Sequence, residues 1–117
     1  MRHNTGYRRL GRNDDHRRAM LRNLTTALFT HGKIETTVTR AKEVSRVAAR
    51  IISTAKRGNL HSRRLIAGYL LSEDVAKKVF DVVAPNLRPR SGGYTRIVRT
   101  RVRKGDAAVM AQLELVQ

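Results

Sequence analysis

The residues whose types could do chemistry are a glycine-containing segment near the start of the chain, two pairs of carboxylates and four histidines. The segment Gly6 to Asn13 approaches the phosphate-loop pattern G-x4-G-K-[ST], in which backbone amides cradle the phosphates of a nucleotide. Arg12 stands where that pattern has its lysine, Asn13 replaces the hydroxyl that binds magnesium, and no apolar strand precedes the segment. The segment therefore predicts a basic arm and not a nucleotide-hydrolysing site.

The paired carboxylates resemble the acid and base of a hydrolase, but their positions have a simpler explanation. Asp14 and Asp15, and likewise Glu73 and Asp74, fall where helices are expected to begin, and the helix dipole stabilises acids there. The histidines show no HExxH-type spacing, and the chain has no cysteine to complete a metal site. We therefore expect no catalytic residue, no metal, no cofactor and no small-molecule substrate, so the chain is not expected to be an enzyme.

The chain is strongly basic, because 25 Lys and Arg residues stand against 9 Asp and Glu residues and give a formal net charge of +16. Nineteen of the basic residues are Arg, whose planar guanidinium forms paired hydrogen bonds with phosphate oxygens. Such a charge repels itself unless a polyanion neutralises it, so nucleic acid is the expected partner. The sequence has no run of 18 apolar residues and no apolar leader, so we expect no membrane contact and a cytoplasmic protein.

The positive charge is concentrated in two segments. Residues 1–22 carry a net charge of +5, and residues 88–104 carry +7 without a single acid. Two adjacent glycines in the second segment, Gly92 and Gly93, would allow an RNA phosphate to approach the backbone closely. A charge spread evenly for solubility would not cluster in this way, so both segments are expected to bind a polyanion.

Few aromatic residues are available to stack on bases. The chain has five, of which Tyr7 and Tyr94 lie in the basic segments and are candidates for stacking on exposed bases. Five are too few for a sheet that binds single strands by stacking, so recognition of the backbone and shape of folded RNA is the favoured mode. A general DNA-packaging or regulatory protein is the alternative, although the sequence shows no helix-turn-helix.

Hydrophobic periodicity predicts the elements that position these residues. The first 13 residues are expected to form an extended basic arm, and residues 14–117 a single globular domain. Helices are expected over residues 14–31, from a cap at Thr39 to Gly58, over residues 60–71, and from Ser72 to a stop at Pro85. Strands are expected over residues 33–38, 94–102 and 109–115. About four helices packed on a small mixed sheet of about three strands give an α+β fold.

Three apolar patterns define the expected core. The clearest is the stripe in the second helix, formed by Ala41, Val44, Ala48, Ile51, Ile52 and Ala55. In the third helix, the side chains expected to face the core are those of Leu65, Ile66, Tyr69 and Leu70. Strict alternation in strand 94–102 predicts one face formed by Arg96, Val98, Thr100 and Val102, and a second face formed by Ile97, Arg99 and Arg101.

Short blocks along the whole chain carry a family resemblance. They are Met1-Arg2-His3, Tyr7 to Arg12, His16 to Asn23, Ile34 to Thr37, Gly92 to Ile97 and Gly105 to Ala108. In this order and spacing they resemble the family of bacterial large-subunit ribosomal protein seventeen. The resemblance implies an α+β domain with a basic N-terminal extension, bound to large-subunit rRNA near the exit of the peptide tunnel. It also implies neighbouring large-subunit proteins as partners and no catalytic activity.

The candidate rRNA-binding residues combine positions that match the family in the arm, the first helix and the 90–96 loop with further basic residues. They are Arg2, His3, Tyr7, Arg8, Arg9, Arg12, His16, Arg17, Arg18, Arg22, Lys42, Arg63, Arg64, Arg90, Gly92, Gly93, Tyr94, Arg96, Arg103 and Lys104. The globular face is expected to dock on RNA helices through phosphate contacts, while the arm orders as it passes between RNA segments.

Overall fold

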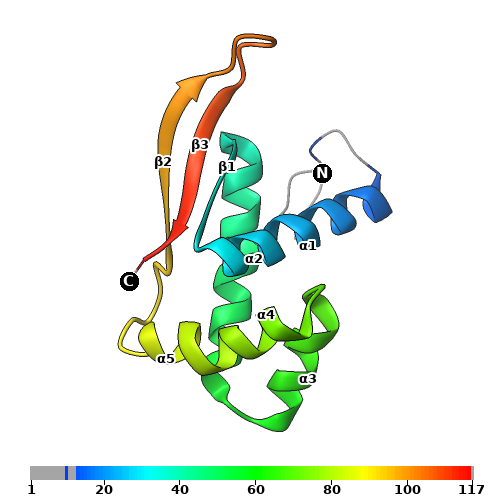
Figure 1. The fold of residues 1–117 in the computed structure, drawn as a ribbon, viewed down its shortest axis with the longest axis vertical. Helices are drawn as coiled ribbons and strands as arrows, with labels where there is room; N and C mark the ends of the chain where they lie inside the picture. Colours follow the sequence, from blue (N-terminus) through cyan, green and yellow to red (C-terminus); the bar gives the residue numbers. More distant parts are fainter. Residues whose placement is uncertain (1–9, 11–12, 117) are drawn as a thin grey trace, which may run out of the picture.

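The computed structural model describes residues 10 and 13–116, so most of the predicted arm lies outside the described residues. Its elements are helix α1 (Asp14–His31), strand β1 (Lys33–Thr37), helices α2 (Val38–Arg57), α3 (Leu60–Tyr69), α4 (Glu73–Lys78) and α5 (Ala84–Asn86), and strands β2 (Thr95–Val102) and β3 (Val109–Leu115). A π-helical turn, Val79–Val83, joins α4 to α5 into one helical segment. The expected α+β class, with four main helical segments on a three-stranded sheet, is confirmed (Figure 1).

Helix α1 begins and ends at the residues that the sequence predicts. The Asn13 side chain accepts a 2.9 Å hydrogen bond from the backbone N–H of His16, and two acids occupy the first turn. Gly32 ends the helix with φ +83°, a left-handed conformation that glycine adopts without strain, and its N–H bonds the carbonyl of Leu28 at 2.7 Å. Both caps fix where the basic first turns of α1 stand relative to the core.

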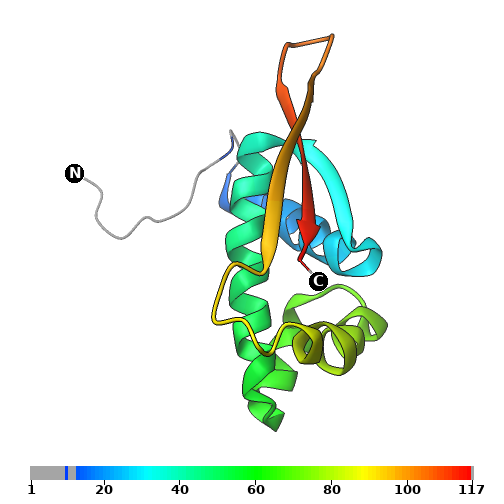
Figure 2. The same ribbon diagram turned by 90° about the vertical axis from the view of Figure 1, so that its left-hand side faces the viewer.

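Helix α2 is the central element of the domain and contacts all three strands as well as α1, α3 and α5 (Figure 2). All six apolar positions of its predicted stripe are buried. The helix begins at Val38, with Thr37 as its N-cap, two residues before the expected cap at Thr39. Thr37 is itself the last residue of β1 and pairs with Met110, so the chain passes from strand to helix without a loop, and the Thr37 side chain makes no capping hydrogen bond.

The sheet has the order β1-β3-β2, and every pairing in it is antiparallel. The expectation of a mixed sheet was therefore wrong. A short turn joins β2 to β3, which forces an antiparallel pair, and β1 joins the free edge of β3 in the same sense. Strands β1 and β2 run parallel to each other but lie on opposite sides of β3. The hairpin of β2 and β3 extends well beyond β1 at one end of the molecule (Figures 1 and 2).

A β-bulge in β2 changes which side chains share a face. Arg99 pairs with Ala111 and Arg101 pairs with Met110, so Thr100 is an extra residue on β2. Arg101 therefore lies on the same face as Arg96, and the strict alternation predicted for this strand holds only up to Arg99. The shift brings Thr100 and Arg101 to the carboxylate of Glu35 on β1, at 2.9 and 3.2 Å.

The α3–α5 region departs from the prediction at two places. Leu65, expected to be inward, is 52% exposed, because the face of α3 that packs on the core is that of Ser62 and Ile66. Pro85 was expected to stop the last helix, but the helical segment runs on to Asn86. Proline lacks an N–H and crowds the carbonyl four residues earlier, and the preceding chain widens into the π-helical turn, which accommodates both effects.

Candidate nucleic-acid interface

The structure divides the basic side chains into those with an acidic partner and those without one. Among the described residues, ion pairs join arginines to carboxylates at Arg17–Asp14, Arg46–Glu43, Arg96–Glu114, Arg101–Glu35 and Arg103–Asp106. Within residues 10 and 13–116, no acidic partner is found for Arg18, Arg50, Arg64, Arg88, Arg99 or Lys104. This second group supplies the positive surface that a polyanion would meet.

Three further basic side chains bind backbone carbonyls inside the fold. Arg22 reaches the last turn of α3, where its Nε donates to the carbonyl of Tyr69 at 2.7 Å. Lys78 donates to the carbonyl of Thr30, near the end of α1, at 3.1 Å. Lys56 donates to the carbonyl of Arg90. Helix ends leave carbonyls without partners, which explains the contacts of Arg22 and Lys78, while Lys56 binds a carbonyl of the loop before β2. All three cations are therefore only partly available to a ligand.

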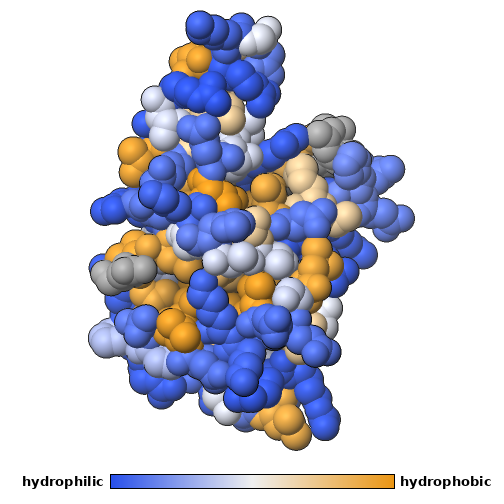
Figure 3. Space-filling view, in the orientation of Figure 1, coloured by the Kyte–Doolittle hydropathy of each residue, from blue (hydrophilic) through white to orange (hydrophobic). Residues whose placement is uncertain are grey.

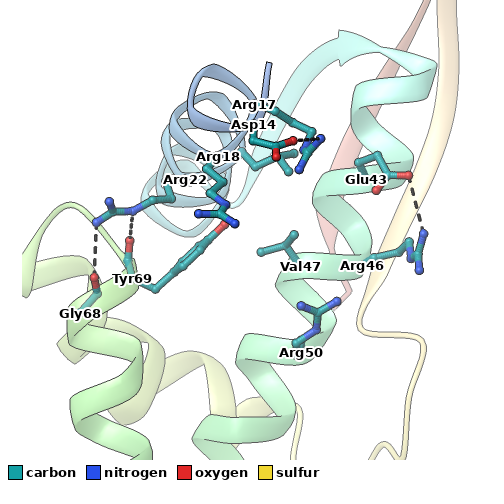
Figure 4. Close-up of a pocket in the computed structure, with 11 residues that line it drawn as sticks. Asp14, Arg17, Arg18, Arg22, Glu43, Arg46, Val47, Arg50, Gly68 and Tyr69 are labelled. Atoms are coloured by element: carbon teal, nitrogen blue, oxygen red, sulfur yellow. Dashed lines mark hydrogen bonds and ion pairs between the residues drawn. The ribbon is translucent and has the colours of Figure 1, made fainter. Parts of the chain in front are cut away.

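A cleft of about 630 Å³ lies between α1, α2 and the end of α3 (Figure 4). Five arginines line it, three from α1 and two from α2, together with Tyr69 and Gly68 of α3. The arginines are Arg17, Arg18, Arg22, Arg46 and Arg50. Two carboxylates, Asp14 and Glu43, also line the cleft and contact Arg17 at 3.2 Å and Arg46 at 3.7 Å. The lining therefore keeps a positive balance after these pairs are formed.

The five arginines differ in where they point. Arg18 and Arg50 are exposed and point into the cleft from opposite walls, whereas Arg46 points away from it (Figure 4). Arg22 lies on the far side of Tyr69, held by the carbonyls of α3. Arg17 is only 6% exposed, so it acts in the domain's packing and presents little of its guanidinium to the surface. The two guanidiniums open to a ligand are thus those of Arg18 and Arg50.

Tyr69 forms the floor of the cleft. Its ring is half-buried and lies 5.7 Å from the guanidinium carbon of Arg22, within the range of a cation–π contact. Burial raises the pKa of the Tyr69 hydroxyl, although a side-chain hydrogen bond with Thr25 and the charges of Arg22 and Arg50 lower it in part. The hydroxyl therefore stays protonated at neutral pH and can donate a hydrogen bond to an anion in the cleft.

A second basic surface covers the projecting end of the β2–β3 hairpin, which is largely hydrophilic (Figure 3). Arg99 and Lys104 are exposed there, beside Val102, which is 59% exposed. Arg103 donates two hydrogen bonds, of 2.9 and 2.7 Å, to Asp106 across the turn. This pairing lowers the pKa of Asp106 to about 2 and makes Asp106, with Arg103, a structural part of the turn.

The loop before β2 is held by its aromatic residue. Tyr94 is only 4% exposed, and its hydroxyl lies 3.0 Å from Nζ of Lys56, which also stands 4.9 Å from the ring centre. The hydrogen bond from Lys56 lowers the pKa of the Tyr94 hydroxyl. The buried ring is not open for stacking on a base, contrary to the interpretation drawn from the sequence. Gly92 and Gly93 are exposed, and Gly93 has φ +63°, with its carbonyl accepting from Arg90 at 3.2 Å.

The remaining candidate residues fall into three groups. His16, Lys42, Arg63 and Arg64 are exposed on helices, with Arg63 placed over the ring of Phe80 at 5.0 Å. Arg96 is exposed but bound to Glu114 through a 2.6 Å hydrogen bond from its Nε. Six candidates lie outside the described residues, namely Arg2, His3, Tyr7, Arg8, Arg9 and Arg12.

Sequence reasoning missed Arg50 and Tyr69 as members of the cleft. Arg50 lies off the apolar stripe of α2 and resembles an ordinary solvated position, while the spacing of Tyr69 in α3 indicates core. A signal was present: Arg46 and Arg50 stand one helical turn apart, as do Arg18 and Arg22. Two such pairs on helices that pack together would gather positive charge in one place.

No helix in the described part of the chain is long and apolar enough to cross a membrane. Among the same residues, no group of three or more His, Cys, Asp or Glu side chains is placed to hold a metal ion.

Comparison with known proteins identifies the class as that of ribosomal proteins. Proteins named large ribosomal subunit protein bL17 are similar over nearly the whole chain. The one from Clostridium acetobutylicum is 56% identical over 112 residues, covering 96% of this chain and 98% of its own length. The one from Fusobacterium nucleatum is 53% identical over 116 residues, covering 99% of this chain and all of its own.

The family model described as ribosomal protein L17 matches residues 20–116, so the chain belongs to the ribosomal protein L17 family. The family resemblance stated from the sequence blocks is thereby confirmed. The chain is a structural component of the large ribosomal subunit and, as a member of this family, not an enzyme.

Proposed function

We propose that the protein binds and stabilises folded rRNA of the large subunit through Arg and Lys contacts to phosphates, on the side near the peptide-tunnel exit. The observation that carries this proposal is the distribution of charge. The basic residues without an acidic partner are exposed in the cleft between α1 and α2, on α3 and along the β2–β3 hairpin, where phosphates can reach them. The tunnel-exit position rests on the family resemblance alone.

The proposed mechanism uses two parts of the chain. The globular domain docks on RNA through phosphate contacts, which fix its position without reading sequence. Residues 1–13, with their four arginines, add contacts beyond the face of the domain. Its other partners would be neighbouring large-subunit proteins, and its location the ribosome in the cytoplasm. The proposal requires no cofactor, metal, membrane or small-molecule substrate.

Competition binding tests the proposal against the alternative of a DNA-binding protein. A labelled fragment of large-subunit rRNA is bound by the full chain and displaced by unlabelled rRNA or by duplex DNA at equal phosphate concentration. We expect the folded rRNA to compete at least tenfold better. If about 6–10 phosphates are neutralised, the affinity should fall roughly 10³–10⁵-fold between 50 and 200 mM salt. Equal competition by DNA, or a flat salt dependence, would contradict the proposal.

A further inference from the structure

The cleft between α1, α2 and α3 lies next to a second, apolar groove. This groove, of about 160 Å³, lies between α2 and α3 and is lined by Ile51, Leu65 and Ile66 among others. The cleft and the groove share three residues, Val47, Arg50 and Tyr69. A charged compartment and an apolar one are therefore neighbours, with Arg50 and Tyr69 at their common border.

We propose that this joined site binds one unpaired nucleotide of RNA, with its phosphate between Arg18 and Arg50 and its base in the apolar groove beside Leu65. The inference rests on the proposed function and names the RNA feature that this part of the surface recognises. It does not depend on the residues outside the described part of the chain.

The charged compartment suits a phosphate. Arg18 and Arg50 stand on different helices, point into the same space and have no acidic partner among the described residues. A guanidinium presents a planar fork of donors that matches phosphate oxygens, and two forks on opposite walls can hold one phosphate. The carboxylates that also line the cleft are bound to Arg17 and Arg46, so their charge is compensated.

The walls of the site are held in place before any ligand arrives. Helices α1 and α2 pack directly on each other through the core. Arg22 fastens α1 to the end of α3 through hydrogen bonds to the carbonyls of Tyr69 and Gly68, at 2.7 and 3.3 Å. The helices that carry Arg18, Arg50 and Tyr69 are therefore already in place when a ligand binds, so less free energy is spent on ordering the backbone of the site.

The apolar compartment favours an unpaired base over a duplex. In a paired helix each base is covered by its neighbours, so a protein mainly meets phosphates and sugars. The groove at Leu65, which is 52% exposed, would then stay open to water beside the bound phosphate. An unpaired base can turn out of its helix and cover this apolar surface, which adds affinity that duplex RNA cannot supply.

The test compares two RNA hairpins, bound by the full chain at fixed salt: one is fully paired, and the other differs from it only by one inserted adenosine that stays unpaired. We expect the bulged hairpin to bind at least fivefold more tightly. The variant R18Q/R50Q should lose at least tenfold in affinity for it, and the slope of affinity against salt should fall by about one to two.

Matched variants separate the site from general charge and from folding. The control R57Q/K77Q removes the same charge from exposed positions outside the cleft, and we expect a loss below threefold. L65S should abolish the preference for the bulged hairpin while leaving the paired one unchanged, and L60S, a 61% exposed leucine of the same helix, should change neither. Circular dichroism melts confirm that each variant is folded.

Two outcomes overturn the inference. Either the wild-type chain binds both hairpins equally, or R18Q/R50Q and R57Q/K77Q lose the same affinity. The proposed function survives both, because rRNA would still outcompete DNA. If the chain fails to prefer rRNA over DNA in the competition experiment, that result contradicts the proposed function itself.

Discussion

The Arg22 guanidinium on α1 donates a 2.7 Å hydrogen bond to the carbonyl oxygen of Tyr69, the last residue of α3 and 47 positions further along the chain. A second bond reaches Gly68 at 3.3 Å. The last carbonyls of a helix have no partners within it, and a cation there also interacts favourably with the negative end of the helix dipole. Arg22 therefore joins two distant helices and sets one wall of the cleft.

Replacing Arg22 with Ala should lower the free energy of unfolding by about 1.5–3 kcal/mol, the usual contribution of a hydrogen bond to a charged group. The measurement is chemical denaturation followed by circular dichroism. Arg18→Ala is the matched control, because Arg18 lies one turn away, is exposed and has no acidic partner among the described residues. We expect it to change stability by less than about 0.5 kcal/mol. Equal effects of the two substitutions would show that the tie to α3 does not stabilise the domain.

Tyr94→Phe should reduce stability by about 1 kcal/mol without changing RNA affinity more than twofold. The substitution removes the hydroxyl that lies 3.0 Å from Nζ of Lys56 and keeps the buried ring. Tyr94→Leu also keeps an apolar side chain there, and it should leave RNA affinity within threefold when measured below its melting temperature. A much larger loss of affinity in the folded Tyr94→Leu variant would mean that the ring stacks on a base after all.

Asp106 should titrate in the folded protein with a pKa of about 2, below its ordinary value of 3.8, because Arg103 donates two hydrogen bonds to it. A carboxyl whose pKa is lowered by folding stabilises the folded state above its ordinary pKa, and this contribution is lost as the pH falls through the folded value. The ionised pair should thus favour the turn at neutral pH and weaken between about pH 4 and 2. Carboxyl chemical shifts measured against pH give the midpoint, and Arg103→Gln should move it upward. An unchanged midpoint would contradict the assigned cause.

Removing residues 2–9 should leave the domain folded, with its melting temperature changed by less than about 3 °C, while its incorporation into subunits weakens. Leu10 remains in this variant, and its side chain packs against the hydrophobic core. Removing residues 2–12 also deletes Leu10, so it should lower the melting temperature further. If the shorter deletion already unfolds the protein, the expected boundary between arm and domain is wrong.

The elements of this fold that were predictable from sequence are those with strong local signals. Helix α2 has six apolar residues at helical spacing, and each of them is buried. Helix α1 is bounded by Asn13 and Gly32, two residues with specific capping chemistry. The bulge at Thr100 was not predictable, because no glycine marks it and the neighbouring residues all suit a strand. The exposure of Leu65 depends on which face of α3 packs on the core, which tertiary packing decides.

The candidate surface was predictable in its charge but not in its geometry. The number of arginines along the sequence was enough to locate the basic segments. The acidic partners of Arg96 and Arg103 were not predictable, because one pair forms across two strands and the other across a turn. Burial of Arg17 depends on the packing of α1 on the domain. The role of Arg50 follows only when α1, α2 and α3 are brought together, because no local pattern distinguishes it from a solvated residue.

Sedimentation of a tagged copy from a bacterial lysate tests the central claim most directly. The gradient is run in low magnesium, so that the two ribosomal subunits separate. The account predicts that the protein runs with the large subunit, remains there after a moderate salt wash and is released when the rRNA is digested. A protein that stays at the top of the gradient, or that leaves the complex only after digestion of DNA, would contradict the claim that it binds large-subunit rRNA.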